Sequence, residues 1–174
     1  MVPDIEIQHL SVCFDTAQGP VYAVNDLSTT FRAGRISGVI GESGSGKSVT
    51  SLSIMGLLQH PGRVVDGEIF FQDQDILSYG KRRMRRVRGK EIAMIFQEPM
   101  TSLNPVYTVG NQIMEMLQEH EDIGKGEAKR RAIEMLRMVG IPSPEKRIHN
   151  YPHEFSGGMR QRAMIAIALA CSPK

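Results

Sequence analysis

The sequence predicts an α/β fold in which a set of strands is followed by a helical segment. Residues 5–14 alternate loosely between apolar and polar side chains, as expected for a half-buried strand. The apolar run 36–40 leads into a glycine-rich loop, and a helical stretch follows, which is typical of a buried strand in an α/β core. Beyond Pro105, apolar residues recur at helical spacing. A chain of 174 residues accommodates one ordinary domain, or one domain with a small appendage.

The composition excludes several classes of protein. Hydrophobic residues make up 41% of the chain, too many for a disordered one. Even the apolar run that contains Met164–Cys171 is far shorter than the roughly 20 residues that span a bilayer, and the N-terminus has no apolar signal core. We expect a soluble, cytoplasmic chain whose two cysteines, Cys13 and Cys171, are buried structural thiols.

The individual elements follow from apolar patterning and from turn residues. A turn-rich stretch, 15–20, separates the first two strands, and His60-Pro61-Gly62 ends the first helix. Gly140, Ile141 and Pro142 form a typical helix ending: a left-handed glycine, a hydrophobic contact and a stop. The predicted elements are strands over 5–14, 22–31, 36–40, 67–71 and 92–96, and helices over 47–58, around 113–117, over 127–139 and over 158–171.

The net charge of +2 hides one dense basic segment. Residues 81–90 contain seven lysines and arginines and no acidic residue. Such a run can bind nucleic acid or anionic lipid headgroups. It contains no aromatic residue, whereas nucleic-acid readers commonly interleave aromatics for base stacking. A solvated helix face near a membrane partner is therefore the favoured interpretation, and no nucleic-acid partner is predicted.

A glycine-rich loop carries the main chemical signal. Its sequence fits G-x-x-x-x-G-K-[ST], and it lies between an apolar run and a helix. Glycines let the backbone N–H groups turn inward around phosphate oxygens, the lysine faces the β- and γ-phosphates, and the last hydroxyl is suited to Mg²⁺. The chain is therefore expected to bind a nucleoside triphosphate through Gly41, Glu42, Ser43, Gly44, Ser45, Gly46, Lys47 and Ser48.

A second helix start with exposed N–H groups is predicted far downstream. Ser156 is a good N-cap, and Gly157 and Gly158 leave the first N–H groups of the following helix open. Alone, this pattern is an ordinary cap. Together with the phosphate loop, it suggests that two chains share two nucleotides.

These motifs resemble those of the ATP-binding subunits of ABC transporters. Gly41–Ser48 resembles their Walker A motif, and the signature motif is matched by Ser156, Gly157, Gly158, Met159, Arg160 and Gln161. Gln97 matches the Q-loop glutamine, which in that family touches Mg²⁺ and the attacking water, so the resemblance implies Ser48 and Gln97 as Mg²⁺ ligands. Phe14 matches the aromatic residue that stacks on adenine; Tyr22 is the alternative, and ordinary core packing is a third.

Two further segments resemble one branch of this family, the dipeptide and oligopeptide importers. These segments are Glu98–Pro105 and Tyr151–Gly158, and the branch also contains nickel and glutathione importers. The resemblance implies a P-loop NTPase with a RecA-like core and an antiparallel β subdomain over 1–97, a helical subdomain over 98–155, and the signature motif with its helix over 156–174. It further implies ATP and Mg²⁺, a second ATP-binding subunit, two membrane-spanning permease subunits and, indirectly, a substrate-binding protein. The location implied is the cytoplasmic face of the cell membrane.

One departure from the family concerns turnover. Its members carry an apolar strand ending in Asp-Glu and a switch histidine after a segment similar to Ala168–Lys174, and neither occurs in these 174 residues. No catalytic base is therefore predicted in this chain, which is interpreted as a truncated part of a longer ATPase. The alternatives are a nucleotide-binding fragment without turnover and, from another class, a DNA-maintenance ABC ATPase. The short interval between Gln97 and Ser156 disfavours the latter because it leaves no room for long coiled-coil arms.

Overall fold

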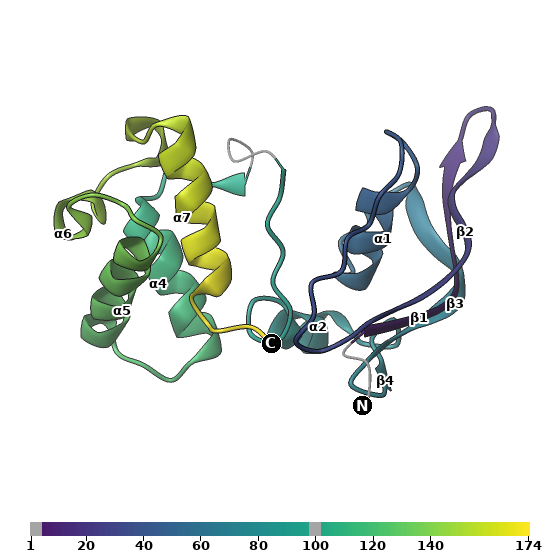
Figure 1. The fold of residues 1–174 in the computed structure, drawn as a ribbon, viewed down its shortest axis with the longest axis horizontal. Helices are drawn as coiled ribbons and strands as arrows, with labels where there is room; N and C mark the ends of the chain where they lie inside the picture. The colour runs from purple at the N-terminus through teal and green to yellow at the C-terminus, as the bar shows by residue number, and fades with distance from the viewer. Residues whose placement is uncertain (1–4, 98–101) are drawn as a thin grey trace. The chain divides into compact units, whose positions relative to one another are not determined.

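The computed structural model describes residues 5–97 and 102–174 of the chain (Figure 1). The described residues divide after Met84 into two compact units, and each is described by itself. None of the helices in these ranges is long and apolar enough to cross a bilayer. The predicted division into functional subdomains after residues 97 and 155 stays a prediction.

The first unit is built on an antiparallel sheet of four strands in the order β2-β1-β3-β4. The strands are β1 (Ile5–Thr16), β2 (Gly19–Phe31), β3 (Gly62–Phe71) and β4 (Gln74–Asp75). Because β1 pairs with both β2 and β3, its apolar side chains are central to the sheet, and Ile7, Leu10 and Val12 are fully buried. The strands predicted over 5–14, 22–31 and 67–71 are confirmed, each somewhat longer than expected.

Helix α1 (Lys47–Ile54) begins where the sequence predicts and ends four residues earlier. Gly56 adopts φ +58°, in the left-handed region, and its N–H donates to the carbonyl of Ser53 at 3.0 Å. This tight turn ends the helix before the His60-Pro61-Gly62 stop that set the predicted boundary.

Two predicted strands do not form. Residues 36–40 adopt no regular structure, and Ile36 and Ile40 are almost fully exposed. Residues 92–96 likewise form no strand beyond one isolated bridge between Arg88 and Ile92, and Phe96 is 41% exposed. The physical reason is shared, since a buried parallel strand is defined by hydrogen bonds to flanking strands, and no strand of the described residues pairs with either segment.

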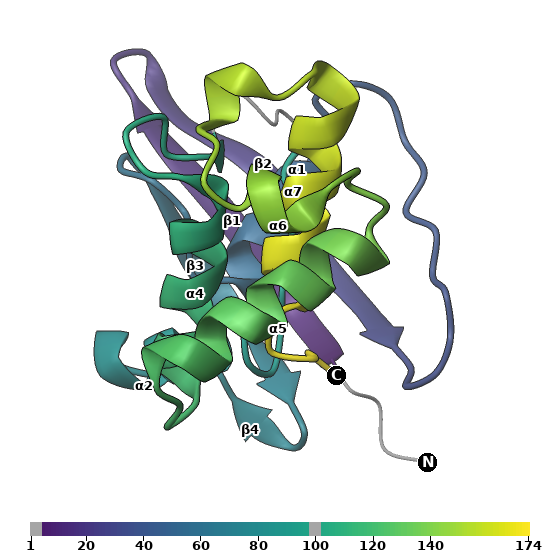
Figure 2. The same ribbon diagram turned by 90° about the vertical axis from the view of Figure 1, so that its left-hand side faces the viewer.

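Helices make up most of the second unit (Figure 2). They are the end of α2 (Lys81–Val87), then α4 (Val109–His120), α5 (Lys125–Met138), α6 (Pro144–Arg147), a 3₁₀ turn (Pro152–Glu154) and α7 (Gly157–Leu169). Helices α4, α5 and α7 pack around one core, which includes Ile113, Leu117, Ala132, Leu136, Met159 and Ala163. The helical character predicted beyond Pro105 is confirmed for the residues described.

The end of α5 shows the predicted stop signal in full. Gly140 adopts φ +73°; its N–H donates to the carbonyl of Arg137 at 3.0 Å, and the N–H of Ile141 donates to the carbonyl of Leu136 at 2.9 Å. These are the two hydrogen bonds of a Schellman motif, and the buried Ile141 supplies its hydrophobic contact. Residues close in the sequence therefore form the motif that ends this helix.

A partly buried ion pair joins the loop after α4 to α5 and α7. Arg131 donates to the carboxylate of Glu121 and, at 3.2 Å, to the carbonyl of Ala170. The Arg131 guanidinium holds the pKa of Glu121 below its ordinary value, mainly through their hydrogen bond. The end of α7 is thereby tied to the other two helices.

The two cysteines are free and buried, as predicted.

Candidate functional site

The Lys47 ammonium group lies at the centre of the glycine-rich loop. Its Nζ donates to the carbonyl of Gly41 at 2.8 Å, to the carbonyl of Glu42 at 2.6 Å and to Ser45 Oγ at 3.1 Å. The N–H of Ser45 also donates to the carbonyl of Glu42 at 3.2 Å, which closes a turn. The Lys47 ammonium is thus held over the loop by neutral oxygens. Because none of these three partners is a carboxylate, the positive charge of Lys47 is not neutralised by them and can attract an anion.

Two positions of this loop require glycine because their backbone φ is positive, and at one of them a side chain would also collide with a neighbouring strand. Gly44 and Gly46 adopt φ +81° and +88°. A Cβ on Gly46 would lie 2.5 Å from the carbonyl oxygen of Ala23 and 3.2 Å from Val24 Cγ2. The last glycine of the motif is therefore the point at which the loop rests on strand β2.

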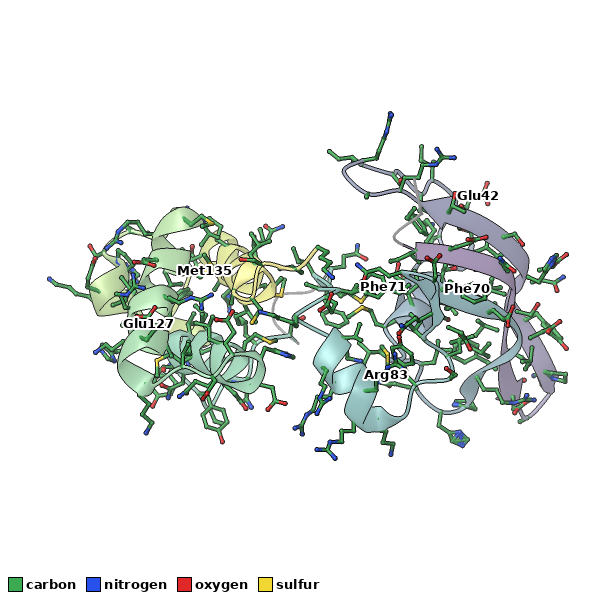
Figure 3. The ribbon with its side chains drawn as sticks, turned by 90° about the horizontal axis from the view of Figure 1, so that it is seen from below. Glu42, Phe70, Phe71, Arg83, Glu127 and Met135 are labelled. Atoms are coloured by element: carbon green, nitrogen blue, oxygen red, sulfur yellow. The ribbon has the colours of Figure 1, made fainter. Side chains whose placement is uncertain are left out.

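The loop leads directly into the positive end of α1. The first hydrogen bond of the helix runs from the N–H of Thr50 to the carbonyl of Gly46 at 2.8 Å. The N–H groups that precede Thr50 have no partner within the helix and point toward the loop end. Ser48 and the side chain of Glu42 are exposed, and Figure 3 labels Glu42 in this loop. Unpaired N–H groups, a helix dipole and an ammonium group are the features with which helix starts bind phosphates, and phosphate binding by this loop stays a prediction.

The two aromatic residues considered for adenine stacking are both on the sheet. Phe14 on β1 is half-buried and lies against Gly62, where a Cβ would come within 2.6 Å of its ring. Tyr22 on β2 pairs with Cys13 and is 57% exposed. Either ring can offer a face to a ligand, so stacking by Phe14 stays a prediction.

The signature segment of the second unit forms the predicted helix start. Ser156 Oγ accepts a hydrogen bond from the N–H of Met159 at 3.3 Å, which makes Ser156 the N-cap of α7. Gly157 and Gly158 are exposed and have nothing within 4 Å of where a Cβ would lie. Gln161 is exposed one turn further along. The N-cap is confirmed, whereas contact with a partner's nucleotide is not tested by this geometry.

Two residues that sequence reasoning missed form hydrogen bonds at this helix start and in the turn before it. The carboxylate of Glu154 accepts from the N–H of Tyr151 at 2.6 Å and from Asn150 Nδ2 at 3.2 Å. Arg162 donates to the carbonyl of Gly140 at 2.6 Å and to that of Gly158 at 3.4 Å. Glu154 follows Tyr151, the N-cap of the 3₁₀ turn, at the spacing of a capping box, but the Ser or Thr that marks such a box in a sequence is absent. The hydrogen bond from Arg162 to Gly140 joins residues 22 positions apart, and no pattern in the sequence indicated it.

Gln97 is exposed and is the last residue described before the gap at 98–101. It belongs to the second unit, whereas the Gly41–Ser48 loop belongs to the first. Within residues 5–97 and 102–174, no group of three or more His, Cys, Asp or Glu side chains is arranged to hold a metal ion. The Mg²⁺ ligands predicted from the resemblance, Ser48 and Gln97, are a hydroxyl and an amide, and both stay predictions.

We expect Ser156→Ala to destabilise the second unit by about 0.5–2 kcal/mol, because the N–H of Met159 loses its capping oxygen. The free energy of urea unfolding measures this. Ser172→Ala is a matched control at an exposed serine beyond α7 and should leave that free energy within about 0.5 kcal/mol of the parent. Equal stability of all three proteins would contradict the capping role.

A family model described as "ABC transporter" matches residues 24–174. The dipeptide transport ATP-binding protein DppD of Haemophilus influenzae is 52% identical over 98% of this chain and 52% of its own length. The oligopeptide transport ATP-binding protein OppD of Bacillus subtilis is 52% identical over 98% of this chain and 48% of its own. The chain therefore spans about half the length of the curated relatives it matches.

Solved structures agree with this assignment at the level of the fold. The ATP-binding cassette MJ0796, in a post-hydrolysis state bound to ADP and Pi, superposes with a TM-score of 0.86 at 23% identity, over 97% of this chain and 70% of that one. A second structure of MJ0796, described as a bacterial ABC transporter cassette, gives a TM-score of 0.85 at 24% identity. The predicted fold class is confirmed as that of an ABC ATPase, of which this chain covers part. The phosphate loop, the signature helix start and the family model together place this chain in the ABC transporter family.

Proposed function

We propose that the full-length protein is the ATP-hydrolysing subunit of an importer of dipeptides or oligopeptides. The observation that carries the proposal is the Gly41–Ser48 loop, in which the Lys47 ammonium lies over the loop at the start of α1. The sequence identity of 52% to a dipeptide and to an oligopeptide transport ATP-binding protein supports peptides as the cargo.

In this proposal the loop binds the phosphates of ATP. Lys47 exchanges its three contacts with loop oxygens for contacts with phosphate oxygens, and the N–H groups at the start of α1 donate to the same anion. Ser48 and Gln97 are the residues that would hold Mg²⁺, which when bound neutralises charge on the phosphates. The exposed hydroxyl of Ser48, one residue beyond the ammonium, fits that role. Phe14 would stack on the adenine.

The signature segment acts on the nucleotide of a second subunit. Ser156 and the N–H groups of Gly157 and Gly158 are exposed on the surface of the second unit, so they are available to a neighbour's phosphate. Two such subunits, identical or paralogous, would enclose two ATP molecules. They would be held at the cytoplasmic face of the membrane by two permease subunits, with cargo delivered by a substrate-binding protein.

The residues that orient the attacking water lie, in this proposal, outside the 174 residues described by the sequence. This accords with a chain that spans about half of its relatives. The alternatives are a nucleotide-binding fragment without turnover, and an importer of nickel or glutathione in place of peptides.

The test is ATP hydrolysis by the full-length protein assembled with its permease subunits in proteoliposomes. We expect turnover that depends on Mg²⁺ and rises when the binding protein is supplied with a dipeptide or oligopeptide. Stimulation by nickel or glutathione alone would reject the peptide cargo and keep the ATPase. Mg·ATP binding without any turnover would reject hydrolysis and leave the nucleotide-binding alternative.

A further inference from the structure

The basic run of residues 81–90 has no part in the nucleotide chemistry, yet it is the strongest concentration of charge in the sequence. Seven of its ten residues are Lys or Arg, and none is acidic. It consists of helix α2 and the turn that follows. The remaining residues carry a net charge of −5, so the run is a local positive surface on an otherwise acidic chain.

Helix α2 has a buried side and an exposed side. Met84 and Val87 are 5% and 8% exposed, and they are one turn apart on the same face. Arg82 and Arg86 are also one turn apart and lie on the opposite face, where both are exposed. Figure 3 shows nitrogen-tipped side chains spreading away from the helix that carries the labelled Arg83. Arg82 and Arg86 therefore lie on the side of α2 opposite its two buried residues.

Some of these cationic side chains already have partners within the chain. Arg83 donates to Gln74, and its guanidinium stacks 3.7 Å from the centre of the Tyr79 ring. Arg85 pairs with Glu119 at 2.7 Å, and Lys90 with Glu121 at 3.5 Å. No such contact involves Lys81, Arg82 or Arg86 anywhere in residues 5–97 and 102–174. Arg88 also takes part in an interaction, so three exposed cations remain, on and beside the outward face of α2.

We infer that this face of α2 binds the anionic phospholipid headgroups of a membrane surface. A flat array of headgroup phosphates complements several outward cations at once, and each Lys or Arg near such a surface strengthens binding by about fivefold. The run itself offers no aromatic ring for stacking nucleic-acid bases, and the nearby Tyr79 ring is already covered by Arg83. These two observations favour lipid over a nucleic acid.

The inference goes beyond the proposed function because it requires neither nucleotide nor permease subunits. The experiment is co-sedimentation of the full-length protein alone, without nucleotide, with vesicles of phosphatidylglycerol and phosphatidylcholine or of phosphatidylcholine only. We expect binding to the anionic vesicles that weakens as salt is raised, and no binding to the neutral ones. In the triple variant Lys81→Gln, Arg82→Gln, Arg86→Gln, binding should fall on the order of a hundredfold.

A matched control removes the same charge elsewhere. Arg35→Gln, Lys125→Gln and Lys129→Gln, all at exposed positions, should leave vesicle binding within about threefold of the parent. The charge-retaining variant Arg82→Lys, Arg86→Lys should also bind as the parent does. Mg·ATP affinity should be unchanged in all three variants, which separates failure of this inference from failure of the nucleotide site.

Four outcomes would overturn the inference. The first is equal binding by the triple variant and the parent, and the second is equal binding to neutral and anionic vesicles. The third is release of the protein by millimolar inorganic phosphate at constant ionic strength, which would indicate a site for free phosphate. The fourth is binding of a short DNA or RNA duplex that is tighter than vesicle binding and is lost in the triple variant, which would make the face a nucleic-acid surface.

Discussion

Lys47→Ala is expected to weaken Mg·ATP binding by tenfold to a hundredfold or more. The substitution removes charge-assisted contacts to the phosphates worth about 1.5–3 kcal/mol each. It also removes the three bonds from Nζ that hold Gly41, Glu42 and Ser45 around one centre. Isothermal titration of the full-length protein with Mg·ATP measures the effect.

The control for this experiment is Lys129→Ala, which removes an exposed lysine from the middle of α5. Its Mg·ATP affinity should equal that of the parent. Circular dichroism and urea unfolding establish that each variant is folded. Unchanged Mg·ATP binding by a folded Lys47→Ala variant would refute the role assigned to the loop.

Gly46→Ala is expected to destabilise the first unit by about 2–5 kcal/mol. Part of this, about 1–2 kcal/mol, is the cost of holding a Cβ at φ +88°. The rest arises because the new methyl group would lie 2.5 Å from the carbonyl oxygen of Ala23, so that the loop and strand β2 must move apart. Urea unfolding gives the free energy, and Mg·ATP affinity should fall with it because the loop loses its support.

Gly44→Ala separates these two contributions. Gly44 adopts a similar φ of +81° but has nothing within 4 Å of where its Cβ would lie. We expect Gly44→Ala to cost only the backbone part, about 1–2 kcal/mol. If both variants lost the same stability, the contact between Gly46 and strand β2 would have no energetic role.

Features encoded by neighbouring residues were predictable from the sequence. The Schellman ending at Gly140, the N-cap at Ser156 and the start of α1 at Lys47 each depend on residues a few positions apart, and all three are confirmed. The strands predicted over 36–40 and 92–96 were wrong because a strand requires a partner from elsewhere in the chain. Apolar composition alone does not supply that partner.

The candidate site was likewise predictable where it depends on residues close in the sequence, and not where it depends on distant ones. The residues of the Gly41–Ser48 loop were identified from their spacing, and the structure places the Lys47 ammonium among them. The dependence of Gly46 on the Ala23 carbonyl was not predictable, since it joins the loop to a strand 23 residues earlier. The support that Arg162 gives to the signature segment was missed for the same reason.

The exposed apolar stretch at residues 36–40 has a consequence for synthesis on the ribosome. Lys174 lies 134 residues beyond Ile40. At roughly 5–20 residues per second, on the order of ten seconds pass before that residue is added. Throughout this time no strand of the described residues covers Ile36 or Ile40, which are 104% and 98% exposed. The nascent chain thus exposes an aggregation-prone apolar segment, and a chaperone that shields it would raise the yield of folded protein.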